Sequence, residues 1–222
     1  MSQISGVMNA DYPGRVILAV DTSLGTAVAL IDADGRSRAD AATIDPLGHA
    51  EVIGDLLQRV LDGAGAGEIS HVVAGMGPGP FTGLRIGIAA ARAFALGRAI
   101  PVLPVPSHFA AALTAIEADA VTGVFAIVTD ARRREVAITV FDGVDGDGIP
   151  SIVAETILIP RVDADTHLGG IRRIDVDALS ALDLARVGAR VSAAGRTLAG
   201  AEPLYLRAPD VSIPGAPKRV GS

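Results

Sequence analysis

The most informative stretch of this 222-residue chain is residues 75–85, GMGPGPFTGLR. It lacks the Lys-Ser/Thr pair of a Walker A phosphate loop, and a dinucleotide fingerprint would need glycine where Thr82 stands. Pro78 and Pro80 carry no backbone N–H, so a phosphate would find few donors here. We interpret the stretch as a stiff entry that fixes the start of a helix and holds Phe81 and Arg85 in place.

The residues before this stretch predict a β-meander followed by a helix. The turn Asp21-Thr22-Ser23-Leu24-Gly25 separates two apolar runs, and Asp34-Gly35 is a hairpin signal after the second run. The predicted strands cover Arg15–Val20, Thr26–Ile31 and Arg36–Ile44. Asp45-Pro46 favours a helix start, and apolar residues then recur at helical spacing over about Gly48–Leu61. His71–Ala74 is a short buried strand.

A second helix is predicted over Thr82–Gly97, with Thr82 as a cap-like residue. Gly83, Gly87, Ala91 and Ala95 recur every four residues along one face of that helix. Small residues in such a row allow another helix to approach closely, so the row predicts a tight helix–helix contact. The contact could be internal or with a partner, and the spacing alone leaves both open.

The rest of the chain predicts a second unit of similar make-up. We expect lobes over residues 15–105 and 106–207 and a flexible tail over 208–222. The expected elements are an irregular edge strand at Ile100–Val105, helices at Ser107–Ala118 and Asp177–Val191, and strands at Val124–Val128, Glu135–Phe141 and Ser151–Ile159. The fold class is therefore α/β or α+β, two-lobed, with mixed sheets.

Composition excludes several classes of protein. The net charge is −6 and aromatic residues make up 3% of the chain, which argues against a large nucleic-acid footprint or base-stacking platforms. No cysteine is present, so a disulfide framework and a Cys nucleophile are excluded. The longest apolar runs hold about six residues, against about 20 for a membrane span. Residues 1–14 show no signal-peptide pattern, and we expect a cytoplasmic protein without membrane contact.

Two segments carry polar chemistry, and each has a plain alternative. Asp21, Thr22 and Ser23 could hold a phosphate through hydroxyl and N–H groups, although these residue types are also ordinary turn formers. Arg132–Arg134 could contact RNA or an acidic partner, or form a solvated basic turn. The four histidines form no HExxH pair, and no GxSxG motif is present, so zinc and serine hydrolase sites are not expected.

Four segments together resemble a known family. Residues 17–30 (ILAVDTSLGTAVAL), 75–95 (GMGPGPFTGLRIGIAAARAFA), 129–141 (TDARRREVAITVF) and 203–211 (PLYLRAPDV) are similar to the bacterial TsaB (YeaZ) family of tRNA threonylcarbamoyladenosine biosynthesis proteins. The resemblance spans residues 15–211, and the second segment is the most specific. It implies the actin/Hsp70-like ATPase (RNase H-like) fold, with two lobes of mixed sheet flanked by helices.

The resemblance also implies a function and partners. The family supports N6-threonylcarbamoylation of adenosine 37 in tRNAs that decode A-starting codons, as a non-catalytic scaffold that binds the catalytic paralogue TsaD. A TsaE-like ATPase joins that complex, tRNA reaches the chain only through it, and the chain alone forms a homodimer. ATP or ADP would bind at the complex interface, and Asp21–Ser23 match the phosphate turn of the superfamily. The partner interface would use both early helices, at Val52, Leu56, Arg59, Gly83, Leu84, Gly87, Ala91 and Ala95.

One departure separates this chain from the catalytic paralogue. The paralogue holds a metal with an HxxxH pair, and alignment places Ser107 and Ala111 at those two positions. Neither residue ligates a metal as histidine does. We therefore expect no metal and no catalytic residue of its own. The alternative from another class is an active enzyme of this fold, either an M22-like metallopeptidase or a small ATPase. A direct RNA-binding module is a third hypothesis.

Overall fold

A computed structural model describes residues 15–44, 48–63, 67–118 and 121–206. The first sheet has the strand order β3-β2-β1-β4-β5. Its strands are β1 (Arg15–Asp21), β2 (Thr26–Asp32), β3 (Ser37–Thr43), β4 (Glu68–Gly75) and β5 (Val102–Val105). β1, β2 and β3 pair antiparallel, as the hairpin signals predict, whereas β4 is parallel to β1 and β5 to β4. The predicted meander is confirmed, and proline-containing β5 lies at an edge of the sheet.

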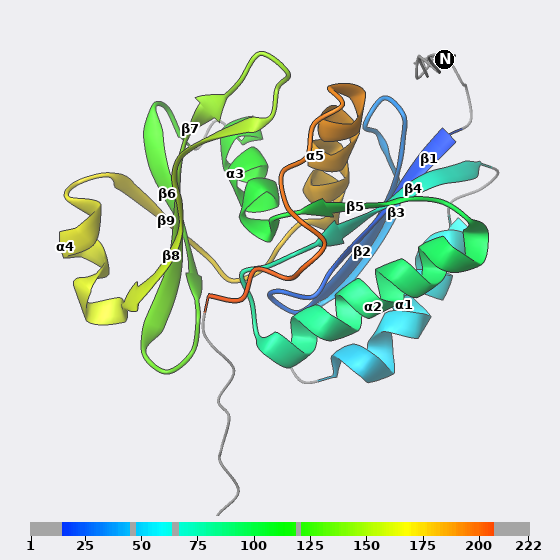
Figure 1. The fold of residues 1–222 in the computed structure, drawn as a ribbon, viewed down its shortest axis with the longest axis horizontal. Helices are drawn as coiled ribbons and strands as arrows, with labels where there is room; N and C mark the ends of the chain where they lie inside the picture. Colours follow the sequence, from blue (N-terminus) through cyan, green and yellow to red (C-terminus); the bar gives the residue numbers. More distant parts are fainter. Residues whose placement is uncertain (1–14, 45–47, 64–66, 119–120, 207–222) are drawn as a thin grey trace, which may run out of the picture.

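Helices cover both faces of this sheet (Figure 1). On one face, α1 (His49–Gly63) and α2 (Phe81–Arg98) pack on Val16, Leu18 and Val20 of β1. On the other face, α5 (Ala181–Ala193) packs on Ile17 and Ala19 of the same strand. Successive side chains of a strand point to opposite faces. This two-sided burial explains why β1 is a continuous apolar run rather than an alternating one.

The second sheet repeats the plan of the first. Its strands are β6 (Val124–Asp130), β7 (Glu135–Val144), β8 (Pro150–Pro160) and β9 (Arg172–Val176), in the order β8-β7-β6-β9. β6, β7 and β8 form an antiparallel meander, and β9 is parallel to β6. The helix α3 (Ser107–Glu117) lies between the sheets with α5, whereas the short η1 (Arg161–Asp163) and α4 (Ala164–Leu168) cover the far side of the second sheet (Figure 1).

The C-terminal helix α5 joins the two sheets into one core. A Cβ added at Gly188 of α5 would lie 2.3 Å from a methyl group of Val73 on β4, so the helix backbone rests directly on the first sheet. Residues of α3, β6 and β7 belong to the same apolar cluster as α5. The first sheet therefore takes a covering helix from late in the chain. The division into lobes 15–105 and 106–207 stays a prediction.

Several local predictions needed correction. Thr82 does not cap α2: the cap position is Pro80, which offers no side-chain hydrogen bond, and Thr82 lies inside the helix. The predicted helix at Asp177–Val191 begins at Ala181, where the Ser180 hydroxyl accepts a hydrogen bond from the amide of Asp183 at 3.1 Å. β7 does not alternate in burial along the predicted span, because α3 covers one of its faces and α4 the other.

The sequence patterns also missed two elements, and two other predictions fall on residues that the structure does not describe. The parallel strand β9 and the helix α4 were not expected, and both complete the second sheet. Asp45-Pro46 and the tail 208–222 lie outside the described residues. Within the described ranges, no helix is long and apolar enough to cross a membrane.

Candidate functional site

The β1–β2 turn is buried and its polar groups are paired within the chain. Asp21 ends β1, and its carboxylate accepts hydrogen bonds from the Ser23 amide at 2.7 Å and from the Ser107 hydroxyl at 2.5 Å. The hydroxyl of Ser107 also lies 2.8 Å from that of Ser23 and accepts from the amide of Gly77 at 3.0 Å. Asp21, Thr22 and Ser23 are each at most 3% exposed.

The end of β4 and the glycine-rich loop after it pack directly against this turn. A Cβ added at Gly75 would lie 1.8 Å from a carboxylate oxygen of Asp21, and one at Gly79 would lie 2.8 Å from the Cα of Ser23. Only glycine lets the two backbones approach this closely. The interpretation of residues 75–85 as a stiff structural entry fits this packing. A phosphate at Asp21–Ser23 would first have to displace the chain's own hydroxyl groups and this loop.

Burial raises the pKa of the Asp21 carboxyl, and the hydrogen bonds from Ser107 and Ser23 oppose that rise. No lysine or arginine side chain hydrogen-bonds this carboxyl among the described residues. Its hydrogen-bond donors are the uncharged amide of Ser23 and the hydroxyl of Ser107. Uncompensated burial of a carboxylate is costly. The network is therefore better suited to joining β1, the loop and α3 than to holding a further anion.

The row of small residues on α2 makes an internal contact. The hydroxyl of Thr22 donates to the carbonyl oxygen of Gly83 at 2.8 Å, and a Cβ at Gly87 would lie 2.2 Å from that same hydroxyl oxygen. A Cβ at Gly83 would lie 2.8 Å from Nε2 of His49 on α1. Ala91 and Ala95 continue the row and are buried in the core. The spacing left open whether the row contacts another part of this chain or a partner. These contacts lie within the chain.

The eight residues expected at a partner interface therefore divide into two groups. Six are buried in this chain and are not exposed to a partner: Leu56, Gly83, Leu84, Gly87, Ala91 and Ala95. Val52 is half-buried and packs against the core cluster beneath α1, and Arg59 is exposed. The helices themselves lie at the surface, so a partner would meet their opposite face.

Residues 204–205, to which the sequence analysis gave no structural role, pack against the start of α2. The amide of Leu204 donates to the carbonyl of Met76 at 2.8 Å, and the ring of Tyr205 lies 4.9 Å from that of Phe81. The guanidinium of Arg85 lies 3.8 Å above the Phe81 ring and donates to the Tyr205 hydroxyl at 2.9 Å. The predicted fixed positions of Phe81 and Arg85 thus depend on residues 120 positions later in the chain. Tyr205 lies in the fourth motif, 203–211, which was the only signal.

Comparison with known proteins supports this architecture. The family model described as "TsaD: tRNA N6-adenosine threonylcarbamoyltransferase" matches residues 46–156, half of the chain. An uncharacterised protein of Mycobacterium bovis is 34% identical over 206 residues, which cover 87% of this chain and 92% of that protein. The Escherichia coli tRNA threonylcarbamoyladenosine biosynthesis protein TsaB is 34% identical over 122 residues, which cover 54% of this chain and 52% of that protein.

A solved structure shows the same fold. It is a Pseudomonas aeruginosa protein described as similar to peptidase YEAZ, with a TM-score of 0.72 and 26% identity, covering 87% of this chain and 100% of that one. The chain belongs to the TsaB/YeaZ branch of the TsaD family. The expected actin/Hsp70-like fold class is confirmed by this likeness. The chain spans about half the length of the E. coli TsaB protein and about a third of a Mycobacterium leprae relative that is 40% identical.

The positions that align with the catalytic paralogue's histidines do not fit a metal in this TsaB/YeaZ chain. Ser107 commits its hydroxyl to Asp21, Ser23 and Gly77, and Ala111 is buried without a ligating atom. Across the described ranges, no three His, Asp or Glu side chains are grouped as a metal site would need.

The neighbouring His108 is a core residue. Its Nδ1 lies 2.6 Å from the Thr139 hydroxyl and its Nε2 lies 2.9 Å from that of Thr129, so α3 is joined to β6 and β7. Complete burial lowers the pKa of His108 to about 3, because the charged imidazolium would lose its hydration. This histidine stays neutral near pH 7, and both of its ring nitrogens are occupied.

Proposed function

We propose that this chain is a non-catalytic subunit in the formation of N6-threonylcarbamoyladenosine in tRNA, and that it acts by binding a TsaD-like catalytic paralogue. Its place in the TsaB/YeaZ branch supports the pathway. The absence of a metal-ligand set at Ser107 and Ala111 supports the accessory role. The observation that carries the proposal is the exposed outer surface of α1 and α2.

The outer surface of α1 and α2, here named the helix-pair face, is partly apolar. Leu96 is 83% exposed there, without a covering element among the described residues. A Cβ added at Gly54 or Gly97 would meet nothing within 4 Å. The exposed small residues of this face are Ala50, Gly54, Ala89, Ala93 and Gly97. Backbones that carry such small residues permit close packing of a second helix pair.

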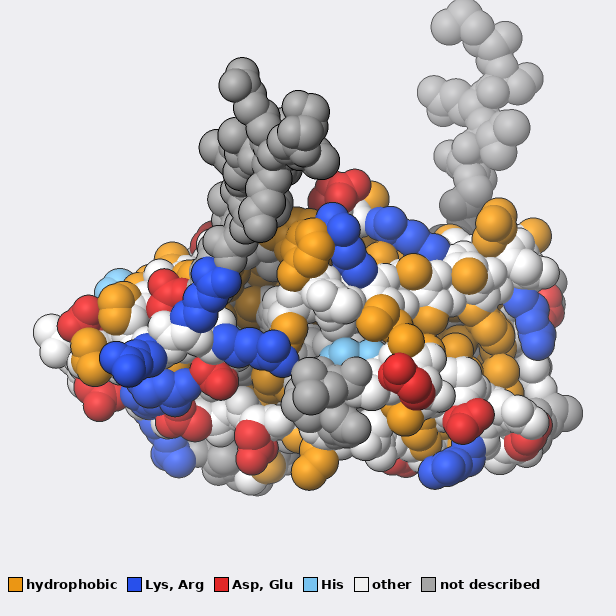
Figure 2. Space-filling view, turned by 90° about the horizontal axis from the view of Figure 1, so that it is seen from below, with side chains coloured by type: hydrophobic (Ala, Val, Ile, Leu, Met, Phe, Trp, Pro, Cys, Tyr) orange, Lys and Arg blue, Asp and Glu red, His pale blue; other side chains and the backbone are white. Residues whose placement is uncertain are grey.

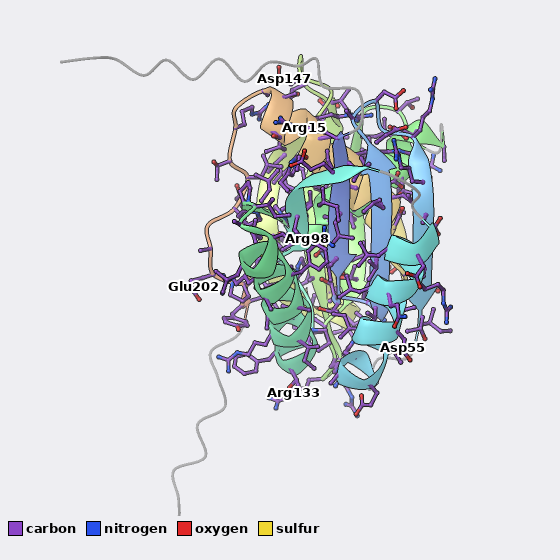
Figure 3. All side chains as sticks on the ribbon, turned by 90° about the vertical axis from the view of Figure 1, so that its right-hand side faces the viewer. Arg15, Asp55, Arg98, Arg133, Asp147 and Glu202 are labelled. Carbon is purple, nitrogen blue, oxygen red and sulfur yellow. The ribbon has the colours of Figure 1, made fainter. Side chains whose placement is uncertain are left out.

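On the helix-pair face, α1 is mainly acidic apart from the exposed Arg59, and α2 carries only basic charges, of which Arg85 and Arg92 also hydrogen-bond Tyr205 and Ala201. The exposed acidic residues of α1 are Glu51, Asp55 and Asp62, and the exposed residues of α2 include Arg85, Arg92 and Arg98 but no acidic residue. Figure 2 shows hydrophobic side chains between acidic and basic ones on this side of the molecule. Figure 3 places Asp55 on α1 and Arg98 at the end of α2.

Such a division of charge suits a partner of the same fold. A two-fold arrangement would set the acidic α1 of one molecule against the basic α2 of the other. The catalytic paralogue would offer an equivalent helix pair, and a second copy of this chain would use the same face to form the homodimer. Val52 and Arg59 stay in the proposed interface, whereas the six buried residues support it from beneath. A TsaE-like ATPase and ATP or ADP at the complex interface complete the proposed assembly, and tRNA enters with that complex.

The proposal is tested by filling the open space on the helix-pair face. Gly54→Trp adds a bulky side chain where nothing is in contact, and replacing a mid-helix glycine does not weaken the helix. We expect the folded variant to lose co-purification with the catalytic paralogue. Gly146→Trp is the matched control, because Gly146 is also exposed with no atom near its Cβ position but lies in the β7–β8 loop. Equal capture by both variants would refute the interface.

A further inference from the structure

Three consecutive arginines form the turn between β6 and β7. The turn, here named the arginine turn, is residues 131–134, and Arg132, Arg133 and Arg134 are all exposed. The amide of Glu135 donates to the carbonyl of Arg132 at 2.9 Å, and the amide of Ala131 donates to the carbonyl of Glu135 at 3.1 Å, so the turn is closed by backbone hydrogen bonds. Figure 3 shows Arg133 at the lower edge of the molecule, far from Asp147 at the other end.

The backbone of the arginine turn is in a conformation that favours glycine. The φ angles of Arg132, Arg133 and Arg134 are 62°, 51° and 63°. Elsewhere in the described residues, the positions with positive φ are nine glycines and one residue of another type, Ala99. Left-handed backbone is unfavourable for residues that carry a Cβ. Three arginines in a row at such positions point to a use for their side chains that offsets the strain.

The guanidinium groups of the turn outnumber the carboxylates beside it. Arg161 adds a fourth guanidinium, since its amide donates to the carbonyl of Arg134 at 2.7 Å. Asp130 is paired with Arg161 at 2.6 Å and accepts from the backbone amide of Arg132 at 3.1 Å. Glu135 is a second carboxylate beside the turn, and Arg133 and Glu135 each have an interaction partner. Within the ranges that the structure describes, the side chains of Arg132 and Arg134 make no hydrogen bond or ion pair. This end of the sheet is basic although the chain carries a net charge of −6.

The arginine turn occupies the place in its sheet that the Asp21–Gly25 turn occupies in the other. Each turn follows the strand that pairs antiparallel with the next strand and parallel with a later one. Both turns lie at the lower ends of their sheets in Figure 1. The first is buried and internally satisfied, whereas the second is exposed and basic. The repeated fold therefore has one closed turn and one open turn at the same side.

We infer that the arginine turn binds the phosphate backbone of tRNA directly. The inference rests on the proposed function, which supplies the RNA, and goes beyond it by giving this chain its own contact with the substrate. Arginine presents a planar fork of N–H donors that matches a phosphate group. The turn holds no aromatic residue on which a base could stack, so the contact positions the RNA without reading its sequence.

The test measures binding of an unmodified tRNA transcript to the full chain by fluorescence anisotropy across a range of salt concentrations. The informative variant is Arg132→Gly with Arg134→Gly, because glycine suits the left-handed backbone and the protein should melt at or above the parent's temperature. We expect affinity to fall about tenfold at low salt, and the slope of log affinity against log salt to decrease by about two.

The control is Arg36→Ala with Arg172→Thr, which removes the same charge from exposed positions elsewhere. Arg172 pairs with Phe125 at the opposite end of the second sheet, and Arg36 lies between β2 and β3. The control should bind tRNA as the parent does. Equal binding by the glycine variant, no binding by the parent, or tighter binding of polyglutamate than of tRNA would overturn the inference. The last result would assign the turn to an acidic protein segment.

Cellular modification levels separate this inference from the proposed function. If depletion of the chain leaves threonylcarbamoyladenosine unchanged, the proposed function fails. If depletion lowers the modification and the glycine variant restores it with parental tRNA affinity, only the direct contact fails.

Discussion

The carboxylate of Asp21, at the end of the first strand, accepts a hydrogen bond of 2.5 Å from the hydroxyl of Ser107, 86 residues later at the start of α3. This contact ties the end of β1 to the start of α3. The Ser107 hydroxyl also accepts a hydrogen bond from the amide of Gly77 at 3.0 Å, so the loop after β4 joins the same network. Asp21 and Ser107 therefore form a structural contact between segments that are far apart in the sequence.

The Asp21 network predicts a stability that depends on pH. The folded state holds the Asp21 proton more tightly than the unfolded chain, whose carboxyl titrates near 3.8. The stabilisation is therefore complete below pH 3.8 and is lost as pH rises through the higher pKa of the folded state. We expect Asp21→Asn to remove this loss, so that its unfolding free energy at pH 7 equals or exceeds that of the parent. Urea unfolding at a series of pH values measures this directly.

Asp55→Asn is the control for that comparison, because it changes the net charge equally at an exposed position of α1. It should leave the pH dependence of the parent in place. A lower stability of Asp21→Asn at pH 7 would show that the charged carboxylate contributes more through its hydrogen bonds than burial costs it.

His108 predicts a dependence of the opposite sign. The folded pKa is about 3 and the unfolded value is 6.5, so below pH 6.5 the unfolded chain binds a proton that the folded chain does not. This contribution is fully present above pH 6.5 and is lost as pH falls towards 3, by about 1.4 kcal/mol for each pH unit.

The measurement that checks the His108 prediction is urea unfolding of His108→Gln between pH 4.5 and 7. The variant should be about 1–3 kcal/mol less stable at neutral pH, because Thr129 and Thr139 lose well-placed partners. Its stability should also change less with pH than that of the parent. An unchanged pH slope would mean that another group controls acid unfolding.

Two glycines of the helix pair provide a matched test of what the small-residue row does. Gly87→Ala would set a Cβ 2.2 Å from the Thr22 hydroxyl oxygen, and we expect a loss of about 1–3 kcal/mol in unfolding free energy. Gly54→Ala meets open space and should gain up to about 1 kcal/mol from helix propensity. Thermal melting of both variants decides the matter. Equal effects of the two would contradict the internal role of Gly87.

Much of the fold could be predicted because local signals agree with the final structure. The Asp34-Gly35 hairpin, the apolar runs of β1 and β2 and the helical spacing of Val52 to Leu61 each act over short distances. Small residues at every fourth position of α2 correctly indicated a close contact, but the predicted partner was a helix, whereas the row packs on the β1–β2 turn at Thr22 and meets α1 only at His49. The spacing could not tell whether the contact is within the chain or with a partner, because Gly83 and Gly87 pack on Thr22, which is about sixty residues away in sequence.

The missed features depend on long-range contacts. β9 is a short polar strand that is ordered by pairing with β6, and its own residues show no strand period. Tyr205 acquires its role only from the ring of Phe81 and the guanidinium of Arg85. The left-handed backbone of Arg132–Arg134 was also hidden, because arginine is not a residue that indicates positive φ.

The most direct test of the central claim is the amount of threonylcarbamoyladenosine in bulk tRNA after depletion of this protein, measured by mass spectrometry. We predict a clear fall that the parent gene reverses and that Gly54→Trp, expressed at the same level, does not. Gly146→Trp should restore the modification. An unchanged level under proven depletion would contradict the account and would return the peptidase and ATPase hypotheses to consideration.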